Sequence, residues 1–428
     1  MERRTFLAGI GGALSTRAFG ANDKVNVAVV GIGGRGKDHI KEYLKLPGAR
    51  IAALCDVDTA GTERGSKMVE VATGTKPKIY QDLRKLYEDK DVDAVSIATP
   101  NHWHALATIW ACQAGKDVYC EKPASYNIFE GQQMVNAARK YNRMVQIGMQ
   151  SRSEAYKMRA VQLVRDGAVG KVYMAKGICY KKRPSIGHTP EEPVPAGLDW
   201  DIFLGPAPMR PFTKNRFHYN WHWFWDTGNG DIGNQGIHEM DVARWGMNRT
   251  VPKSVVSTGG KFVYEDDQET PNTQIATFDY GDAELVFEVR GMPTGSESDI
   301  RFGGANAVGT VFFGDKGYMT VDDKGYRTFL GDKHEPGPSG AAGTEDTGPH
   351  MDNFLKAVKS RRYQDLHGDV AEGVSSVYLV HMANISYRLG RKLTVDPPTL
   401  TFKNDAEANA MKTRPEYRKP YVVPNLTA

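Results

Sequence analysis

A glycine-rich turn that follows an apolar run has the spacing of a site for the phosphates of a dinucleotide. The run VNVAVV at 25–30 continues directly into GIGGRG at 31–36. Between a strand and a helix, Gly31 permits the tight bend, Gly33 lets the backbone approach a pyrophosphate, and Gly36 lets helix and strand pack closely. The free N–H groups at the helix start then hold the phosphates. A glycine turn in an unrelated α/β domain is the alternative, and the expected cofactor contacts here are Gly31, Ile32, Gly33, Gly34, Arg35 and Gly36.

An acidic residue at the end of the next apolar run narrows the choice of cofactor. The run at 50–55 leads directly to Asp56, where a carboxylate accepts a hydrogen bond from a ribose 2′-hydroxyl. The same carboxylate repels a 2′-phosphate. The sequence therefore predicts NAD as the cofactor and disfavours NADP.

Lys122 is the first candidate catalytic residue. The apolar run at 117–120 ends directly before Glu121, Lys122 and Pro123, so a strand there delivers both charged side chains to the carboxyl edge of a sheet, where ligands bind. Pro123 fixes its own φ and favours an extended conformation at Lys122. A lysine beside a nicotinamide can stabilise an alkoxide as hydride leaves, whereas a solvated surface lysine is the alternative interpretation.

His238 is the second candidate catalytic residue. A glycine-rich segment at 228–237 leads to it, and a helical pattern follows from Val242. Because imidazole titrates near neutral pH, His238 can act as a general base toward a sugar hydroxyl. A structural histidine is the alternative, and Asp241 can be an acid that packs the helix rather than a catalytic one.

The segment 180–226 is the expected substrate collar. Four of the seven tryptophans of the chain lie in it, and aromatic faces stack on the C–H face of a sugar while Arg and His reach its hydroxyls. Tryptophans that fill a core are the alternative. His218 and His222 are four residues apart, but without an HExxH frame we expect no metal site. The expected substrate-binding residues are Lys122, Tyr180, Arg183, Arg216, His218, Trp221, Trp223, Asp231, Asn234 and His238.

Alternating strand and helix patterns must position these residues. The alternation predicts an α/β fold with a doubly wound parallel sheet. The strands are expected at 25–30, 50–55, 93–98, 117–120 and 143–147, and the helices at 37–46, 60–73, 82–88, 102–114 and 128–140. After a helix near 154–166, residues 171–330 alternate polar and apolar positions, which predicts a large, mostly antiparallel sheet that is exposed on one face or used for assembly.

The last hundred residues combine loops with two helical patterns. Residues 336–349 are rich in Gly and Pro and predict a flexible loop, helices are expected at 350–361 and 369–389, and the proline-rich tail predicts an extended arm. The expected organisation is a signal segment, a nucleotide-binding domain, a substrate-binding domain and a C-terminal arm, at 1–20, 22–150, 151–395 and 396–428.

The motifs together resemble the Gfo/Idh/MocA family, named for glucose–fructose oxidoreductase and inositol dehydrogenase. The resemblance rests on four motifs: GIGGRG with Asp56, TPNHWH at 99–104, EKP at 121–123 and DIGNQGIHEMD at 231–241. The resemblance implies a Rossmann domain, a C-terminal α+β domain whose open sheet often forms a dimer or tetramer, a catalytic Lys122 and an acid/base His238. It also implies cofactor contacts at Thr99, Pro100, Asn101, His104, Glu121 and Lys122.

One departure from the family pattern lies four residues before the histidine. Sugar and inositol dehydrogenases of the family usually carry Asp there, and this chain has Asn234, which we include among the catalytic candidates. Asn can orient an imidazole but supplies no charge. Asp231 compensates only if the loop folds back, so simple dehydrogenase activity is less secure than the resemblance alone implies.

Composition argues against several other classes of protein. The formal net charge is +4, and residues 1–20 account for half of it, which argues against a nucleic-acid partner. No apolar run is long enough to span a membrane. The four cysteines lack metal-ligand spacing, and those within apolar runs are expected to be buried thiols.

The first twenty residues have the pattern of a twin-arginine export signal. Arg3 and Arg4 precede an apolar stretch, and residues 18–20 form an acceptable small-residue cleavage site. An uncleaved arm is the alternative. Because this route exports folded proteins, often with their cofactor, we expect a periplasmic or exported protein that uses the twin-arginine machinery and retains its NAD.

Three functional hypotheses follow. The first is an exported NAD-dependent oxidoreductase that transfers hydride from a CH–OH group of a sugar, sugar derivative or cyclic polyol, with Lys122 and His238 on either side of the reacting carbon. The second is a redox-neutral NAD-dependent glycoside hydrolase or lyase that works through a transient keto-sugar. The third is a binding protein without catalysis, which the intact EKP motif and His238 disfavour.

Overall fold

Six parallel strands form the sheet of the N-terminal half. The computed structural model describes residues 23–292, 306–343 and 347–427, so the predicted signal at 1–20 lies outside the described residues. Every adjacent pair in the order β3-β2-β1-β4-β5-β6 is parallel. The order reverses between β1 and β4, which places the ligand-binding crevice there. The strands are β1 (Val25–Val30), β2 (Ala49–Cys55), β3 (Lys78–Tyr80), β4 (Ala94–Ile97), β5 (Asp117–Cys120) and β6 (Val145–Ile147).

Helices cover both faces of this sheet. Alternate residues of β1 belong to two separate hydrophobic clusters, with Val27 and Val29 in one and Ala28 and Val30 in the other, as the two-residue period of a strand requires. The predicted doubly wound fold is therefore confirmed. The helices are α1 (Arg35–Lys45), α2 (Thr59–Thr73), α3 (Leu83–Glu88), α4 (Asn101–Gln113) and α5 (Ile128–Lys140).

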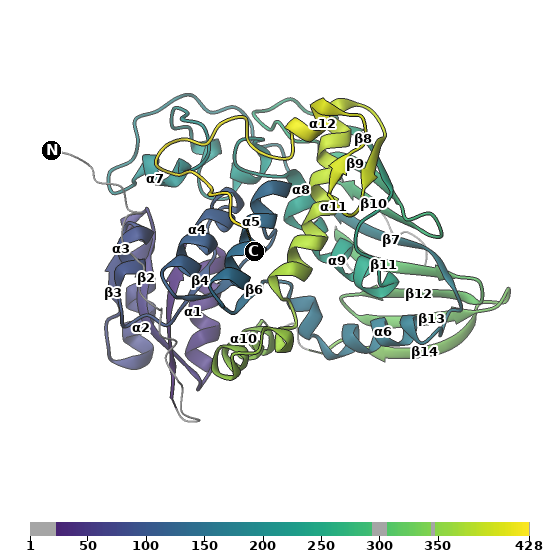
Figure 1. The fold of residues 1–428 in the computed structure, drawn as a ribbon, viewed down its shortest axis with the longest axis horizontal. Coiled ribbons are helices and arrows are strands. Elements are labelled where there is room, and N and C mark those ends of the chain that lie inside the picture. The colour runs from purple at the N-terminus through teal and green to yellow at the C-terminus, as the bar shows by residue number, and fades with distance from the viewer. Residues whose placement is uncertain (1–22, 293–305, 344–346, 428) are drawn as a thin grey trace.

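Ten strands form the second sheet, which lies beside the first with a long helix between them (Figure 1). The order is β14-β13-β12-β11-β7-β10-β9-β8-β15-β16, and only the central β7–β10 pair is parallel among the described strands. This confirms the expected, mostly antiparallel sheet. The strands are β7 (Val172–Lys181), β8 (Ser254–Gly260), β9 (Thr273–Asp279), β10 (Glu284–Arg290), β11 (Asn306–Gly314), β12 (Gly317–Asp322), β13 (Gly325–Leu330), β14 (Glu335–Ala341), β15 (Leu393–Asp396) and β16 (Thr401–Phe402).

Three helices of the second half cover one face of this sheet. They are α6 (Ala155–Arg165), α9 (Gly236–Met247) and α11 (Val370–Leu389), and α11 is the helix between the sheets. A buried ion pair joins α9 to the chain just before α6, because Arg152 binds both carboxylate oxygens of Asp241. Asp241 therefore packs the helix. In contrast, α10 (Gly348–Ser360) packs on α1 and the parallel sheet.

Two predictions about irregular segments need correction. Residues 336–341, expected in a flexible loop, belong to β14, the edge strand of the large sheet. Pro336 and Pro338 are compatible with that position because an edge strand leaves some N–H groups unpaired. The tail is not uniformly extended either, since the short helix α12 (Ala406–Ala410) interrupts it after β16. Only its last residues form an extended arm, which ends beside α5.

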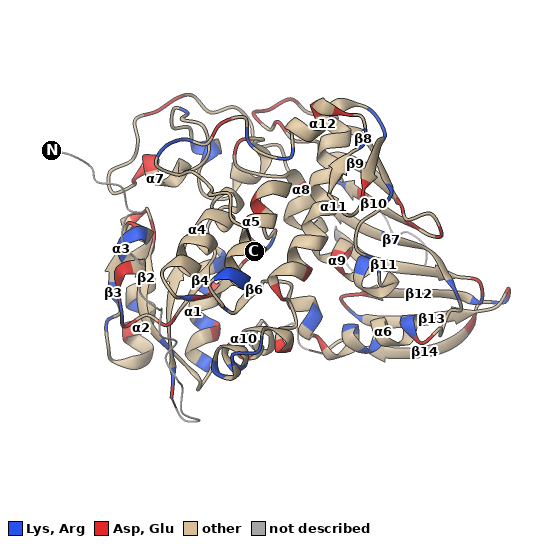
Figure 2. Ribbon diagram, in the orientation of Figure 1, with Lys and Arg blue, Asp and Glu red and all other residues tan. Residues whose placement is uncertain are grey.

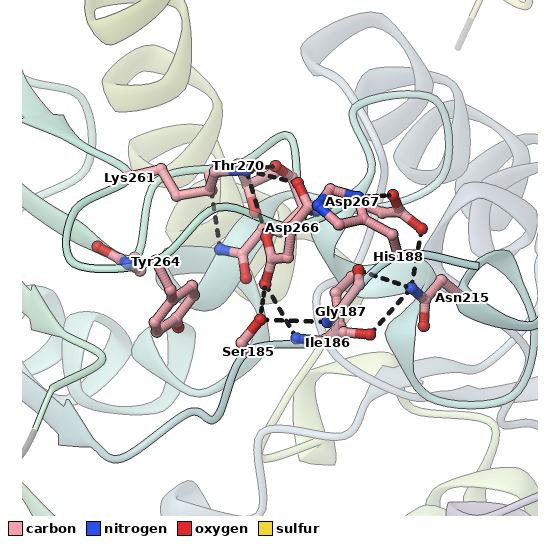
Figure 3. Close-up of polar contacts among 12 residues, drawn as sticks. Ser185, Ile186, Gly187, His188, Asn215, Lys261, Tyr264, Asp266, Asp267 and Thr270 are labelled. Carbon is pink, nitrogen blue, oxygen red and sulfur yellow. Dashed lines mark hydrogen bonds and ion pairs between the residues drawn. The ribbon is translucent and has the colours of Figure 1, made fainter.

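A long connection, residues 182–226, leaves β7 and covers the top of the parallel sheet before the chain returns at α8 (Gly230–Asn234); we call it the strap. Its first part is anchored to the second half by two acids (Figure 3). Asp266 accepts hydrogen bonds from Ser185 Oγ and Ile186 N, both at 2.9 Å. Asp267 accepts one from Asn215 Nδ2 at 2.9 Å and lies 2.7 Å from His188 Nδ1.

The middle of the strap is fastened to the nucleotide-binding half. The carbonyl of Gly197 accepts from Thr59 N at 3.1 Å, and Asp199 N donates to the carbonyl of Val57 at 3.0 Å. The helix α7 (Trp200–Leu204) then lies on α4, where the indole N–H of Trp103 donates to a strap carbonyl at 2.9 Å. The strap thus bridges the two halves above the carboxyl ends of the parallel strands.

Charged residues of both signs are distributed over both halves of the ribbon (Figure 2). Within the described part of the chain, no helix is long and apolar enough to cross a membrane.

Candidate active site

The glycine turn is closed toward the protein and open toward the crevice. Gly31 has φ +85°, and a Cβ there would lie 2.7 Å from the carbonyl oxygen of Ala98. A Cβ at Gly36 would lie 1.8 Å from the carbonyl oxygen of Gly31. At Gly33 and Gly34, in contrast, a Cβ would face open space, with no atom within 4 Å apart from those of the adjoining residues of the chain. This cradle, at the start of α1, fits the pyrophosphate of a dinucleotide.

Asp56 follows β2 at the edge of the same crevice. Its carboxylate accepts a hydrogen bond from the N–H of Ile32 in the glycine turn and another from Asp58 N at 2.9 Å. Burial raises the pKa of Asp56, and the two backbone N–H groups oppose that shift. The acid therefore supports the turn and also lines the crevice, where a ribose hydroxyl would meet it.

Replacing Asp56 with Asn is expected to shift the preference for NADH over NADPH by about 10- to 100-fold toward NADPH, because one charge that repels a 2′-phosphate is removed. Fluorescence titration of cofactor-free protein with each dinucleotide measures the ratio of the two dissociation constants. Glu63→Gln, which removes an exposed acid of α2, is the matched control. An unchanged ratio in Asp56→Asn would contradict the assigned role.

A cavity of about 450 Å³ extends from Asp56 to His238, between the two halves of the chain. Its wall contains most of the predicted cofactor contacts and half of the predicted substrate contacts. The cofactor contacts on the wall are Gly31, Gly33, Gly34, Arg35, Asp56, Thr99, Pro100, Glu121 and Lys122, and the substrate contacts are Lys122, His218, Trp221, Asn234 and His238.

The other predicted cofactor contacts lie behind this wall and support it. Ile32 is fully buried in the core, and Gly36 is packed against the turn. The amide of Asn101 donates to Asn229 Oδ1 at 2.6 Å. The ring of His104 lies between two main-chain carbonyl oxygens, of Pro123 at 2.7 Å and of Thr99 at 2.9 Å, and so braces the turns that end β4 and β5.

Lys122 reaches from the parallel sheet to the second half of the chain. Its Nζ donates to the main-chain carbonyl of Asn234 at 2.8 Å. Burial lowers the pKa of Lys122, and the neighbouring Glu121 opposes that shift. Because the amine is held by one neutral carbonyl, its other N–H groups are available to an oxygen in the cavity. The peptide bond that follows Lys122 is cis.

Glu121 joins the glycine turn to Lys122. Its Oε1 accepts from Arg35 Nε at 2.9 Å and lies 3.0 Å from His39 Nε2, and its Oε2 accepts from Lys122 N at 3.2 Å. Burial favours the neutral acid, but the Arg35 guanidinium overrides it and holds the pKa of Glu121 well below its usual range. Because the Glu121 carboxylate is charged and bound to Arg35 and to the N–H of Lys122, it positions both of these residues.

His238 lies in the first turn of α9 and lines the same cavity as Lys122. Burial, and then the positive charge of Lys122, hold the pKa of His238 well below its usual value. The imidazole is therefore neutral at physiological pH. A neutral ring accepts a proton, which is what a base for a substrate hydroxyl requires.

Asn234 contacts both Lys122 and the strap. Besides its main-chain contact with Lys122, its amide donates to Tyr219 OH at 2.9 Å. Asp231 does fold back to within 3.4 Å of this amide. Its two oxygens, however, accept from Arg183 at 2.7 and 2.9 Å. The charge of Asp231 is thus already paired, so it does not replace the missing acid at position 234.

The other half of the predicted substrate contacts do not line this cavity. Arg183 and Asp231 form the ion pair behind the wall, Trp223 is buried in the core, and Arg216 binds Glu269 at 3.4 Å away from the cavity. Tyr180 lies on the opposite face of the large sheet, because Cys179 already points toward the helices and successive strand residues alternate.

Some lining residues were outside the predicted sets. Phe203, Phe217, Tyr219 and His222 lie within the expected collar, whereas Gln150 lies outside it. Gln150 comes just after β6, so the strand-edge rule that identifies Lys122 also applies to it. In the strap, sequence spacing carries no such signal, because its aromatic residues alternate between core and cavity.

The structure shows how the potential metal-ligating side chains and the thiols are arranged. Among the described residues, no group of three His, Cys, Asp or Glu side chains is arranged to hold a metal ion. All four cysteines are buried and unpaired, and burial raises the pKa of each thiol.

Comparison with family models covers both halves of the chain. A model described as an oxidoreductase family with an NAD-binding Rossmann fold matches residues 25–149. A second model, described as the C-terminal alpha/beta domain of the oxidoreductase family, matches residues 169–282 and 323–423. The two matches divide the chain between the parallel and the antiparallel sheet.

Named relatives and solved structures agree with this division. The chain is 29% identical over 221 residues to a glycosyl hydrolase family 109 protein of Saccharopolyspora erythraea, covering 50% of this chain and 43% of that protein. It is 30% identical over 158 residues to an inositol 2-dehydrogenase of Salmonella typhimurium, covering 36% and 46%. Each match thus spans less than half of the relative. The WlbA dehydrogenase of Bordetella pertussis, solved with NADH and UDP-GlcNAcA, shares the fold, with TM-score 0.63, 20% identity and coverage of 87% and 99%.

Proposed function

The chain belongs to the Gfo/Idh/MocA family of NAD-binding oxidoreductases, and on that premise we propose that it transfers hydride between NAD and a hydroxyl-bearing carbon of a sugar, sugar derivative or cyclic polyol. The observation that carries this proposal is that Lys122, Asn234 and His238 line the same cavity as the glycine cradle, with Lys122 bound to the carbonyl of Asn234. When bound there, NAD supplies the hydride acceptor.

The side chains divide the remaining chemistry between them. His238, neutral at physiological pH, accepts the proton of the substrate hydroxyl. Lys122 donates a hydrogen bond to the same oxygen and stabilises the negative charge that develops on it. Asn234 holds Lys122 through its carbonyl and Tyr219 through its amide, and so fixes the distance between the two halves of the site.

A carbohydrate or polyol is the substrate class that the wall of the cavity supports. The strap contributes an aromatic surface in which the rings of Trp221 and His222 stack with centroids 3.6 Å apart, and such surfaces bind the C–H face of a sugar. The names of the matched relatives, an inositol dehydrogenase and a glycosyl hydrolase, point to the same class.

Redox-neutral cleavage of a glycoside is the second candidate. Two observations favour it: the match to a glycosyl hydrolase family 109 protein, and the pairing of Asp231 with Arg183, which leaves His238 without that acid as a partner. In this reaction the bound NAD would take up a hydride and later return it. The acidified neighbouring carbon would lose a proton, the glycosidic bond would break as the leaving oxygen gains a proton, and in a hydrolase water would add to the resulting double bond before the ketone is reduced.

One experiment separates the two candidates. The protein, purified with the NAD it retains, is mixed with sugars, glycosides and inositols while nicotinamide absorbance is followed and products are separated by chromatography. Reduction of NAD with an oxidised sugar as product supports the oxidoreductase. Cleaved glycoside without lasting reduction supports the second candidate, and neither product with any substrate contradicts both.

Export to the periplasm is part of the same proposal. The twin-arginine pattern at 1–20 supports it, as does a site in which the strap covers the crevice, because an exported enzyme must keep its NAD. Reoxidation then uses a second sugar or another acceptor that enters the same site. The large open sheet, with Val256 and Ile275 exposed, supports a homo-oligomer.

Loosening the C-terminal arm is expected to speed the loss of NAD. Arg418 and Tyr421 of the arm both bind Asp201 of the strap, Tyr421 through its hydroxyl at 2.8 Å. The double variant Arg418→Ala/Tyr421→Phe should raise the dissociation rate about tenfold, since removing these bonds weakens closure by roughly 1.4 kcal/mol or more. Exchange of bound NAD against excess labelled NAD measures the rate. Arg391→Ala, which breaks an ion pair with Asp405 elsewhere on the surface, is the control. Equal dissociation rates in the two variants would show that the contacts of the arm with Asp201 do not retain NAD.

A further inference from the structure

A second cavity, of about 430 Å³, adjoins the first one at His238. Arg35, Gln150 and His238 line both cavities, so a ligand in the second cavity can touch the proposed base. Most of the rest of its wall comes from α6, α9 and the strands β7, β11 and β12 of the large sheet. The mechanism proposed above uses none of this wall except His238.

The wall of the second cavity carries a row of hydrogen-bonding side chains. Lys181 Nζ donates to Gln235 Oε1 at 3.0 Å, and Gln235 Nε2 donates to Glu239 Oε1 at 3.3 Å. Thr310 of β11 lies on the same wall. The row therefore offers both donors and acceptors to a ligand, next to His238.

One carboxylate oxygen of Glu239 has no hydrogen-bond partner among the described residues. Its side chain is largely buried, with the residue 9% exposed, and Oε2 has no hydrogen bond among the described residues. A buried polar atom of this kind is normally satisfied in the native protein or in its complex. A hydroxyl group of a ligand in the cavity would satisfy it.

The charges of the wall favour a neutral ligand. Apart from the Lys181–Gln235–Glu239 row, the charged side chains are mostly paired within the protein: Lys157 with Glu154, Arg35 with Glu121, and Asp322 with Arg327. The cavity thus presents no concentrated charge for a phosphate or carboxylate. Many hydrogen-bonding groups without an excess of charge suit a polyhydroxylated molecule.

We propose that the second cavity binds a second sugar unit, joined by a glycosidic bond to the sugar whose hydroxyl reacts between Lys122 and His238. This inference rests on the proposed function and makes it more specific, since the substrate becomes a disaccharide or longer glycoside. The cavity volume is about 430 Å³. Arg35, Gln150 and His238 border both cavities, so the glycosidic bond of such a substrate would pass beside these three side chains.

The test compares sugars with the disaccharides that contain them. Glucose, galactose and N-acetylglucosamine are compared with cellobiose, maltose, lactose and N,N′-diacetylchitobiose as reductants of the NAD bound to the full-length protein. We expect at least one disaccharide to have kcat/KM about tenfold above its monosaccharide, and Val308→Phe, which fills the cavity from β11, to remove that advantage. Val71→Phe, on an exposed position of α2, is the matched control and should leave it intact.

Two outcomes overturn the inference, and they differ from failure of the proposed function. If monosaccharides are oxidised and disaccharides give no advantage, or if Val308→Phe keeps the advantage, the second cavity is not a sugar subsite. If no sugar reduces NAD, the oxidoreductase proposal fails, and calorimetric titration of the same disaccharides into NADH-loaded protein decides the subsite alone. If a disaccharide binds to the wild type and not to Val308→Phe, the result supports the sugar subsite. If no disaccharide binds to the wild type, the result overturns the subsite.

Discussion

Replacing Lys122 with Ala is expected to lower kcat by about 10³-fold while the protein keeps its NAD. The reason is the position of Nζ, which is held by the carbonyl of Asn234 with its other N–H groups available to the cavity. These N–H groups would stabilise the negative charge that develops on the substrate oxygen in the transition state, so their loss lowers kcat. The glycine cradle and Asp56, which line the same cavity, would hold the pyrophosphate and the ribose of the cofactor without Lys122.

The measurement is single-turnover reduction of bound NAD, with the NAD content of each sample determined after denaturation. Lys116→Met is the matched control, because Lys116 is also buried with a pKa lowered by burial, to about 8, and donates only to the main-chain carbonyls of Asp89 and Val92. We expect this control to lose stability but keep its turnover number. Parallel loss of NAD and of activity in Lys122→Ala would show that the lysine holds the cofactor instead.

The parallel half of the fold is predictable because its signals are local. The glycine turn needs Gly31 and Gly36 for contacts within one strand–turn–helix unit, and the structure shows those contacts. Asp58, Asp82 and Asn127 cap the helices that follow them through their own side chains. The same locality places Lys122 at the end of β5, one residue past Glu121, before any tertiary contact is known.

The substrate side is less predictable because its residues depend on the course of the strap. Nothing in the spacing of Trp221 and Trp223 shows that the first lines the cavity and the second fills the core. The side that Tyr180 faces is set by the register of β7 in a sheet whose neighbours are distant in sequence. Likewise, the ion pair between Arg183 and Asp231 joins residues that are 48 positions apart. Local sequence patterns do not predict such a long-range contact.

Glu239 should make the protein less stable as the pH rises from about 5 to 8. Burial raises its pKa from 4.5 to about 7, against the opposing charges of Lys157 and Lys181. Between these two values the folded protein keeps a proton that the unfolded chain releases, so the free energy of unfolding falls as pH rises through this window. The full difference is about 3 kcal/mol above pH 8. The other ionisable groups that line the same cavity are Arg35, Glu154, Lys157, Lys181, His238, Asp322 and Asp323.

The variant Glu239→Gln removes this dependence and keeps the side-chain shape and the oxygen that accepts from Gln235. Relative to the wild type, we expect it to be more stable by about 2–3 kcal/mol at pH 8.5 and nearly equal at pH 4.5. Urea unfolding at both pH values, with saturating NAD, measures the difference, and Glu63→Gln on the exposed face of α2 controls for the loss of one acid. A gain of the same size at both pH values would mean that Gln improves packing, and that the ionisation of Glu239 in the second cavity is not what limits stability.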